Sequence, residues 1–222
     1  MSSIAKQNFD QNKQDVASLW AIHQEIAGAG PGRKRDVEVI NRSAMIFITA
    51  CWESYIEDVA KESFEFILQH MTGAQSVPAK LKAFVAAPYL EQKDPRKVWE
   101  LADSGWKTIL IGRKNEILNE WLGHFNTPKT AQIDQLFEEL LGLKRLSNCW
   151  HWQRVNNEAA KKKLDDYVTI RGNIAHRIRH SGAVYKNWGI GYLRHTEGLV
   201  HCTDQKMREY VNGLVGTYPW PV

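Results

Sequence analysis

Paired cysteines, long apolar runs and low-complexity tracts are all missing from this sequence. The three cysteines, Cys51, Cys149 and Cys202, lie far apart and lack the paired spacing of zinc or redox sites. No apolar run approaches the roughly 18–20 residues of a membrane helix, and the N-terminus lacks the apolar core of a secretory signal. These absences predict a cytoplasmic protein with reduced thiols, no membrane contact, no metal and no cofactor.

What the sequence does contain is the composition of a well-packed globular chain. Hydrophobic residues make up 43% of it and there are nine tryptophans, which argues against disorder. The chain is long enough for one sizeable domain or two small ones, and no repeat or shift in composition marks a boundary. We therefore expect one all-α domain over residues 1–222.

Apolar residues recur at helical spacing along most of the chain. This periodicity predicts helices over residues 4–27, 36–71, 96–112, 133–141, 157–180 and 203–215. Gly142 marks the end of the fourth of these. Before the last helix, Gly189, Gly191 and Gly198 interrupt the pattern, which favours a loop or a short β-hairpin near 184–202.

The helix expected over residues 157–180 carries the strongest positive charge in the chain. From residue 154 to residue 194, nine Lys or Arg stand against three acids, a local balance of +6, whereas the whole chain is +4. Such a concentration favours an acidic partner such as RNA. Arg171 falls on the apolar stripe of this helix, whose other members are Leu164, Tyr167, Val168, Ile174, Ala175 and Ile178.

Arg171 and His176 together carry groups that can cleave RNA without a metal ion. A histidine can take the proton from a ribose 2′-hydroxyl or give one to the leaving oxygen. The fixed fork of arginine matches phosphate oxygens and stabilises charge that builds in the transition state. Asn173, between the two, can position the histidine or the substrate. This segment is the candidate catalytic site.

The spacing of these residues poses a geometric difficulty. Five residues at about 100° each place Arg171 and His176 roughly 140° apart on an ideal helix. Either the helix is distorted at Gly172, a poor helix former, or a second copy of the chain completes the site. A two-fold pair of these helices would bring two arginines and two histidines to one cleft.

An arginine followed by a histidine after four to six residues is a weak signal by itself. The pattern occurs three times, and only one of its instances lies in a strongly periodic helix with a basic surround. The alternative interpretation therefore stays open: Arg171 is a core or interface ion-pair partner, and His176 is an ordinary helix histidine. The three instances are Arg171–His176, Arg145–His151 and Arg194–His201.

The segment from Arg171 to His176 resembles the Arg-x4–6-His motif of HEPN domains, specifically of the RiboL-PSP-HEPN group of prokaryotic proteins. Residues 50–57 (Ala-Cys-Trp-Glu-Ser-Tyr-Ile-Glu), 125–128 (Phe-Asn-Thr-Pro) and 133–137 (Ile-Asp-Gln-Leu-Phe) resemble the same group. Together with the motif, these stretches span residues 41–180 or so.

The resemblance implies a HEPN-like helical bundle that works as a homodimer and cleaves RNA without a metal ion, leaving a 2′,3′-cyclic phosphate. Arg171 and His176 then carry the catalysis in a composite cleft at the dimer interface. The resemblance also implies the family's usual settings: RNA processing, phage-defence effectors, and toxins partnered by an antitoxin or regulatory protein. The alternative is a non-catalytic HEPN-like module that binds RNA, a nucleotide or a protein.

One departure from the family pattern bears on activity. Active members commonly place a polar residue directly after the arginine, whereas this sequence has Gly172 there and Asn173 one position later. Either Asn173 does the same work in a shifted register, or activity is weakened or lost. Ile178 stands where HEPN toxins silenced by AMPylation have a tyrosine, which argues against that form of control.

Residues near the motif are candidates for orienting the site and for binding RNA. Glu53, from the helix expected over 36–71, is a candidate to orient Arg171, or else an exposed acid on a solvated face. Basic side chains are candidates to guide a phosphate backbone into the cleft, namely Arg177, Arg179, His180 and Lys186. Aromatic side chains are candidates to stack on bases, namely Trp150, Trp152, Tyr185 and Trp188.

Overall fold

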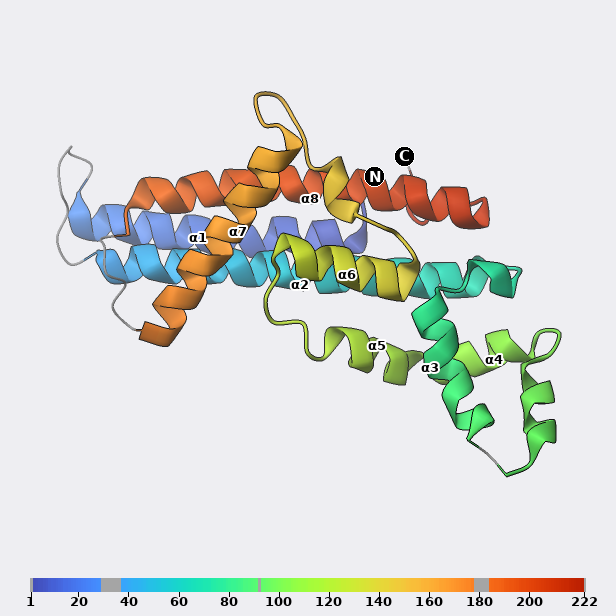
Figure 1. Ribbon diagram of the computed structural model, residues 1–222. Helices are drawn as coiled ribbons and strands as arrows, with labels where there is room; N and C mark the ends of the chain where they lie inside the picture. The colour runs from blue at the N-terminus through green and yellow to red at the C-terminus, as the bar shows by residue number, and fades with distance from the viewer. Residues whose placement is uncertain (1, 29–36, 92, 178–183, 222) are drawn as a thin grey trace.

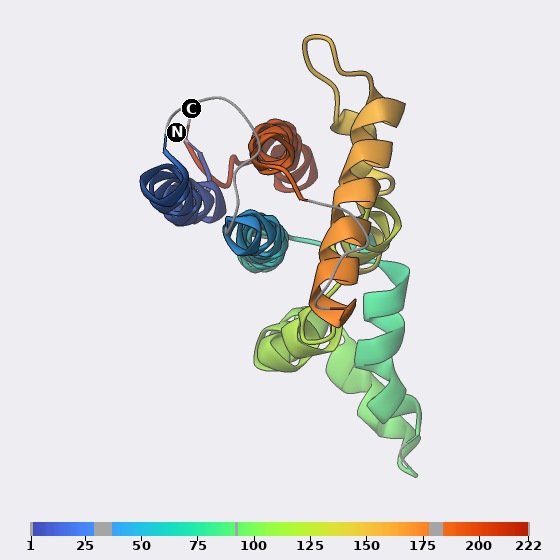
Figure 2. The ribbon, with the colours of Figure 1, turned by 90° about the vertical axis from the view of Figure 1, so that its left-hand side faces the viewer.

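Three long helices, α1 (Ile4–Ala27), α2 (Glu38–His70) and α8 (Lys186–Val215), lie side by side and form the body of the molecule (Figures 1 and 2). The computed structural model describes residues 2–28, 37–91, 93–177 and 184–221. Within these ranges the regular elements are α-helices and short 3-10 helices, with no β-strand. The all-α fold class is confirmed. None of the helices in the described ranges combines the length and apolar character needed to cross a membrane.

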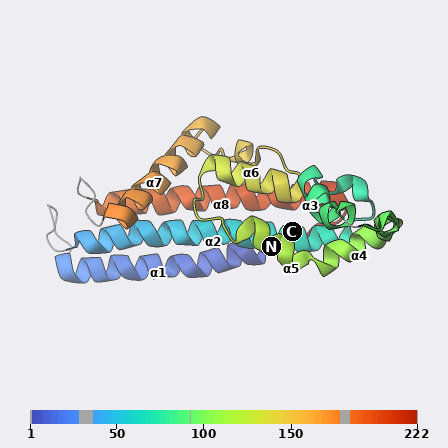
Figure 3. The same cartoon turned by 60° about the horizontal axis from the view of Figure 1, so that its bottom comes forward.

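Shorter helices complete the arrangement. The helix α7 (Asn157–Arg177) crosses α2 and α8, and α6 (Thr130–Leu141) packs against α2 (Figure 1). The elements α3 and α4 lie toward the end of the bundle opposite the C-terminal end of α7 (Figure 3). The remaining bounds are α3 (Ala79–Leu90), α4 (Gly105–Gly112), α5 (Lys114–Leu122), η1 (Ala74–Ser76), η2 (Pro95–Leu101) and η3 (Leu146–Cys149).

The helix α2 is the centre of the main hydrophobic core because other helices pack against it on several sides. Trp52 and Tyr55 are fully buried and stack with their ring centroids 5.8 Å apart. The Trp52 indole Nε1 donates a hydrogen bond to the Pro128 carbonyl at 3.1 Å, which ties α2 to the chain just before α6. Trp150 meets Trp52 edge to face and donates to the Thr203 hydroxyl on α8. The buried indole N–H groups of Trp52 and Trp150 thus have hydrogen-bond partners, which stabilises the core.

Side chains from two other helices secure the start of α1. The Ser3 hydroxyl caps the helix by accepting from the Lys6 N–H, and it donates to the Asp204 carboxylate on α8. The Glu62 carboxylate of α2 accepts from the free N–H groups of Ile4 and Ala5. Donors that helix α1 cannot satisfy by itself are thereby paired, and α1 is held to both neighbours.

A second, smaller hydrophobic cluster holds together the end of the bundle where α7 finishes and α8 begins. It draws side chains from α1, α2, α7, α8 and the residue just before α8, so it fixes the C-terminal part of α7 against three long helices. The buried members are Val16, Met45, Ile48, Ile174, Val184 and Tyr192. This cluster positions the motif helix.

The loop or hairpin expected near 184–202 is wrong, because α8 runs unbroken from Lys186 to Val215. The glycines allow neighbouring aromatic rings to approach the helix. A Cβ on Gly189 would lie 2.5 Å from the Trp20 ring, and one on Gly198 would lie 2.8 Å from the Trp152 ring. Such approaches exclude any side chain, so these glycines serve packing rather than turning.

We expect Gly198→Ala to destabilise the fold by about 1–3 kcal/mol, because the added methyl group must displace the Trp152 ring. Gly213→Ala is the matched control: it lies on the same helix with nothing within 4 Å of an added Cβ. It should stabilise the protein by about 0.5–1 kcal/mol through better helix propensity. Urea unfolding of both variants measures the difference. Equal effects at the two positions would contradict the packing explanation.

Candidate functional site

The motif helix α7 is built as the apolar stripe predicts. Leu164, Val168 and Ile174 are buried against the bundle, whereas Ala175 is exposed and Ile178 lies outside the described residues. Near the start of the helix, the Asn156 side chain accepts from the Ala159 N–H at 2.8 Å. The helix therefore has a defined beginning and a buried face, and it presents Arg171 over α2 and α8.

Gly172 does not interrupt this helix, which continues through residue 177. A Cβ placed on Gly172 would meet nothing within 4 Å, so no close packing requires the glycine. The structure thus offers no helix distortion to bring Arg171 and His176 onto one face. On a regular helix they remain roughly 140° apart, so the alternative of a distorted helix is wrong, and the second-copy alternative stays a prediction.

The Arg171 guanidinium is partly buried and short of partners. Its Nε atom is shielded from solvent, and within the described ranges it has no hydrogen-bond acceptor. Its charge is nevertheless felt by two neighbours, since it acts on the pKa of both Glu53 and Tyr192. A desolvated guanidinium donor without an acceptor is costly and is suited to receive an anionic oxygen.

Glu53 lies on α2 within electrostatic reach of Arg171. Burial raises the pKa of the half-buried Glu53 carboxyl, and the Arg171 charge opposes that rise. The salt bridges found in the described part of the chain do not include a direct pair between the two residues. One turn further along, burial, with the Glu53 charge as the next cause, raises the pKa of Glu57 to about 7. The described contact between the two residues is therefore electrostatic, without a direct salt bridge.

Tyr192 on α8 lies close enough to Arg171 for the arginine charge to act on its phenol. Burial raises the pKa of its phenol well above the ordinary value, so it stays neutral. The hydroxyl shares a 2.9 Å hydrogen bond with Thr49 Oγ1 on α2, and the ring stacks on Tyr167 with centroids 4.2 Å apart. Sequence analysis missed Tyr192 because it lay in the expected loop. Its signal was the helical spacing of residues 188, 192, 195 and 199, which the glycines obscured.

Comparison with protein-family models decides the family. The model of RiboL-PSP-HEPN matches residues 8–209. This chain belongs to the RiboL-PSP-HEPN family. Searches of curated proteins and of solved structures found no match. Membership in the HEPN family indicates a nuclease-like or RNA-related helical module, and it agrees with the all-α architecture.

The other candidate residues of this HEPN chain are placed to different extents. Asn173 is exposed on α7, next to Gly172. His176 and Arg177 belong to α7, but their side chains lie outside the described part of the structure, as do Arg179 and His180 altogether. The roles predicted for these residues stay predictions.

Of the remaining basic and aromatic candidates, Lys186, Tyr185 and Trp188 lie at the start of α8, whereas Trp150 and Trp152 follow η3. The Lys186 ammonium lies 5.9 Å from the centroid of the Trp20 ring, a cation–π contact. Tyr185 and Trp188 are exposed, whereas Trp152 is partly buried and Trp150 is fully buried. The structure therefore excludes Trp150 as a base-stacking residue, whereas Tyr185 and Trp188 are exposed enough to stack on bases.

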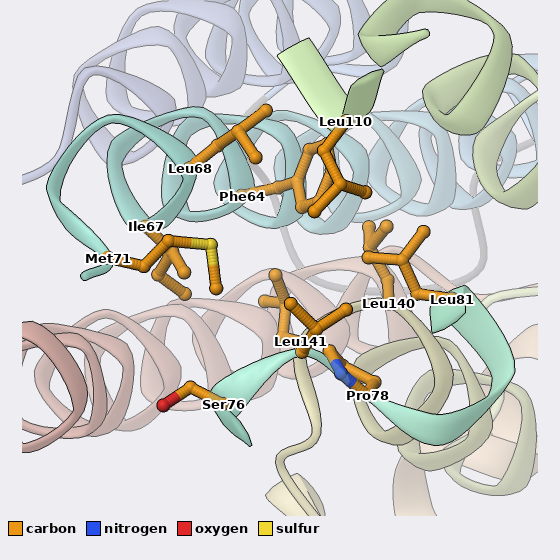
Figure 4. Close-up of a pocket in the computed structure, with 11 residues that line it drawn as sticks. Phe64, Ile67, Leu68, Met71, Ser76, Pro78, Leu81, Leu110, Leu140 and Leu141 are labelled. Atoms are coloured by element: carbon orange, nitrogen blue, oxygen red, sulfur yellow. The ribbon is translucent and has the colours of Figure 1, made fainter. Parts of the chain in front are cut away.

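Metal-binding groups and pockets are two further kinds of candidate site. In the described ranges, His, Cys, Asp and Glu form no group of three or more arranged to hold a metal ion. A small pocket lies between α2, α3, α4 and α6, with apolar side chains facing one another (Figure 4). None of its lining residues is titratable, so it lacks the groups needed for acid–base chemistry.

His195 on α8 secures the motif helix by a neutral hydrogen bond. Its ring is 3% exposed, and its Nε2–H donates to the Ala160 carbonyl of α7 at 3.0 Å. Burial lowers the pKa of this histidine to about 4, well below the ordinary value near 6.5. Because the folded protein resists protonation there, His195 favours folding above pH 6.5, and this contribution is lost as the pH falls toward 4.

We expect this loss to amount to about 3 kcal/mol between pH 7 and pH 4. Glu57 acts in the opposite direction, since its raised pKa makes the fold more stable as the pH falls from 7. The His195 effect is therefore measured as the difference in unfolding free energy between wild type and His195→Gln at each pH. The difference should shrink on acidification, and a pH-independent difference would contradict the buried neutral histidine.

Proposed function

We propose that this RiboL-PSP-HEPN chain is a metal-independent endoribonuclease that acts as a homodimer. The observation that carries the proposal concerns Arg171 on α7, the helix that holds the family's motif. Its buried Nε has no hydrogen-bond acceptor among the described residues. In the proposal, a phosphate oxygen of RNA accepts from the exposed side of the guanidinium, since the side chain as a whole is only partly buried. The local excess of positive charge from residue 154 to residue 194 supports a polyanionic substrate.

The proposed reaction is attack of a ribose 2′-hydroxyl on the adjacent phosphorus. His176 removes the 2′-hydroxyl proton or delivers a proton to the departing 5′-oxygen. Arg171 stabilises the negative charge that accumulates on the phosphoryl oxygens. The P–O bond to the 5′-oxygen breaks, which leaves a 2′,3′-cyclic phosphate on one product and a 5′-hydroxyl on the other. Asn173 positions the substrate from the exposed side of α7.

A second copy of the chain completes the proposed site. The continuous helix turns Arg171 and His176 to different sides, so one copy's arginine is proposed to work with the other copy's histidine. The α2 face that carries Glu53 supports such pairing. Val39 and Ile46 precede Glu53 at seven-residue intervals on that face and are exposed large apolar residues. An exposed apolar stripe next to the motif suits a subunit contact.

Cleavage of RNA by the purified protein in EDTA tests the function. We expect products that end in a 2′,3′-cyclic phosphate, because the 2′-hydroxyl is the nucleophile. Salt-dependent RNA binding with no cleavage would instead select the non-catalytic module, which Gly172 in the motif favours. The settings of a toxin with its antitoxin or of a phage-defence effector belong to the same proposal and depend on the same activity.

A further inference from the structure

Tyr185 and Trp188 form an exposed aromatic pair at the start of α8. Tyr185 is 56% exposed and Trp188 is 38% exposed. Their rings meet edge to face with centroids 5.8 Å apart and an interplanar angle of 73°. Trp52 and Trp150, by contrast, are buried in the core. The pair leaves ring faces open to a ligand.

The backbone under this pair is held firmly. Val184, directly before Tyr185, is buried in the same small cluster as Ile174 of α7. Its carbonyl accepts a 2.9 Å hydrogen bond from the Asn41 side-chain amide of α2. The Trp188 N–H then donates to the Tyr185 carbonyl and begins the helix. These contacts therefore hold the backbone that carries Tyr185 and Trp188 in place.

The pair lies close to the motif. Trp188 precedes Tyr192 by four residues, so its position is about one helical turn, or roughly 6 Å, away along α8. Tyr192 is the residue whose phenol senses the Arg171 charge. Ile174, one turn beyond Arg171 on α7, shares its cluster with Val184. The aromatic pair therefore flanks the place proposed for the phosphate.

The charge beside the pair suits a polyanion rather than an apolar partner. Lys186 lies between the two aromatic residues in sequence, and its ammonium is held over the Trp20 ring. Arg194, two turns further along α8, is exposed. Positive charge together with exposed aromatic rings suits the binding of an unpaired nucleic-acid strand, because every base has a face that can stack. A base inside a duplex has no free face to offer.

We propose that Tyr185 and Trp188 are a stacking platform for an unpaired base of the RNA strand whose phosphate lies at Arg171. This inference rests on the proposed RNA-cleaving function and adds a substrate class to it. The platform selects single-stranded RNA over duplex RNA, because only a splayed base reaches the rings. It also fixes the register of the strand, since the stacked nucleotide and the phosphate are held at two defined points.

The test is equilibrium binding of the 222-residue chain to a short, fluorescein-labelled, single-stranded oligouridine with 2′-O-methyl riboses, which cannot be cleaved. Trp188→Ala should raise Kd about tenfold, the loss expected for one stacked base. Trp188→Phe keeps a ring and should stay close to wild type. Trp99→Ala is the control, since Trp99 is 78% exposed but lies on η2, remote from the motif. The same strand annealed to its complement should bind more weakly to wild type.

The possible outcomes distinguish a failure of the proposed stacking platform from a failure of the proposed nuclease activity. If wild type cleaves RNA but Trp188→Ala binds the probe as wild type does, the platform is wrong and the nuclease stands. If RNA is not cleaved but probe binding depends on Trp188, the platform stands and the nuclease is wrong. If wild type does not bind the probe, the platform is wrong, and the cleavage assay in EDTA decides the nuclease separately. Loss of the dimer in Trp188→Ala, measured by analytical ultracentrifugation, would make the pair a subunit contact and overturn the platform.

Discussion

His176→Ala is expected to abolish RNA cleavage in EDTA while the helical bundle stays folded. Removal of a general acid or base typically slows a reaction by about 10²–10⁴-fold. The fold should tolerate the change because the end of α7 is secured elsewhere, by Ile174 in the cluster with Val184 and Tyr192. Single-turnover cleavage of a labelled RNA measures the rate, and circular dichroism measures the retained helix.

The matched control is His201→Ala. His201 is exposed on α8 and belongs to a second Arg–His spacing, with Arg194, that the structure leaves on an outer face. Its loss should leave the cleavage rate unchanged. If His176→Ala cleaved at the wild-type rate, the catalytic assignment of the motif would be wrong.

Arg171→Ala is expected to slow cleavage by about 10²–10³-fold and to weaken RNA binding. The guanidinium is the group proposed to contact phosphate, so its loss should also reduce the salt dependence of binding by roughly one phosphate contact. Arg171→Lys keeps the charge but loses the planar fork, and should recover binding better than it recovers cleavage. Cleavage rates and Kd at several salt concentrations measure both effects.

Stability distinguishes this account from the ion-pair interpretation of Arg171. The residue makes no hydrogen bond or salt bridge among the described residues, so Arg171→Ala should change the unfolding free energy little. A structural ion-pair partner would instead cost several kcal/mol on removal. Arg194→Ala, at an exposed position, controls for the loss of one positive charge. A large stability loss specific to Arg171→Ala would favour the structural role.

Elements with local start and stop signals could be predicted from the sequence. The bounds of α1 match the expected 4–27, since Gly28 has a left-handed φ of 66° at its end. Gly142 ends α6 with a φ of 80°, and the Leu143 N–H closes the turn on the Phe137 carbonyl. At these positions the neighbouring residues alone determine the chain's path.

Elements determined by distant neighbours could not be predicted in this way. The glycines of α8 looked like turn residues, but Trp20, Tyr167 and Trp152, far away in sequence, require them. The single helix expected over 96–112 is wrong as well. It splits into η2 and α4 at Asp103, whose φ is 51°, and at Gly105, where a Cβ would collide with the Glu100 carbonyl. In α8, contacts across the fold thus override local propensity, whereas the break near Gly105 involves only neighbouring residues.

The candidate site was anticipated in its helix and only partly in its surroundings. Arg171, which the sequence places on the apolar stripe, is partly buried, and Glu53 lies within its electrostatic reach. The phenol of Tyr192 and its bond to Thr49 depend on the packing of α8 against α2, which no short stretch of sequence encodes. The motif therefore named a helix as the candidate site, whereas the surface that faces this helix is known only from the fold.

Mixing two inactive subunits tests the central claim most directly. Arg171→Ala and His176→Ala chains, co-expressed with different tags and purified as the mixed dimer, retain one intact Arg171–His176 pair contributed by both copies. The account predicts recovery of about half the wild-type cleavage rate in EDTA, since one of two composite sites is restored. A mixed dimer as inactive as either parent would contradict a site shared between subunits.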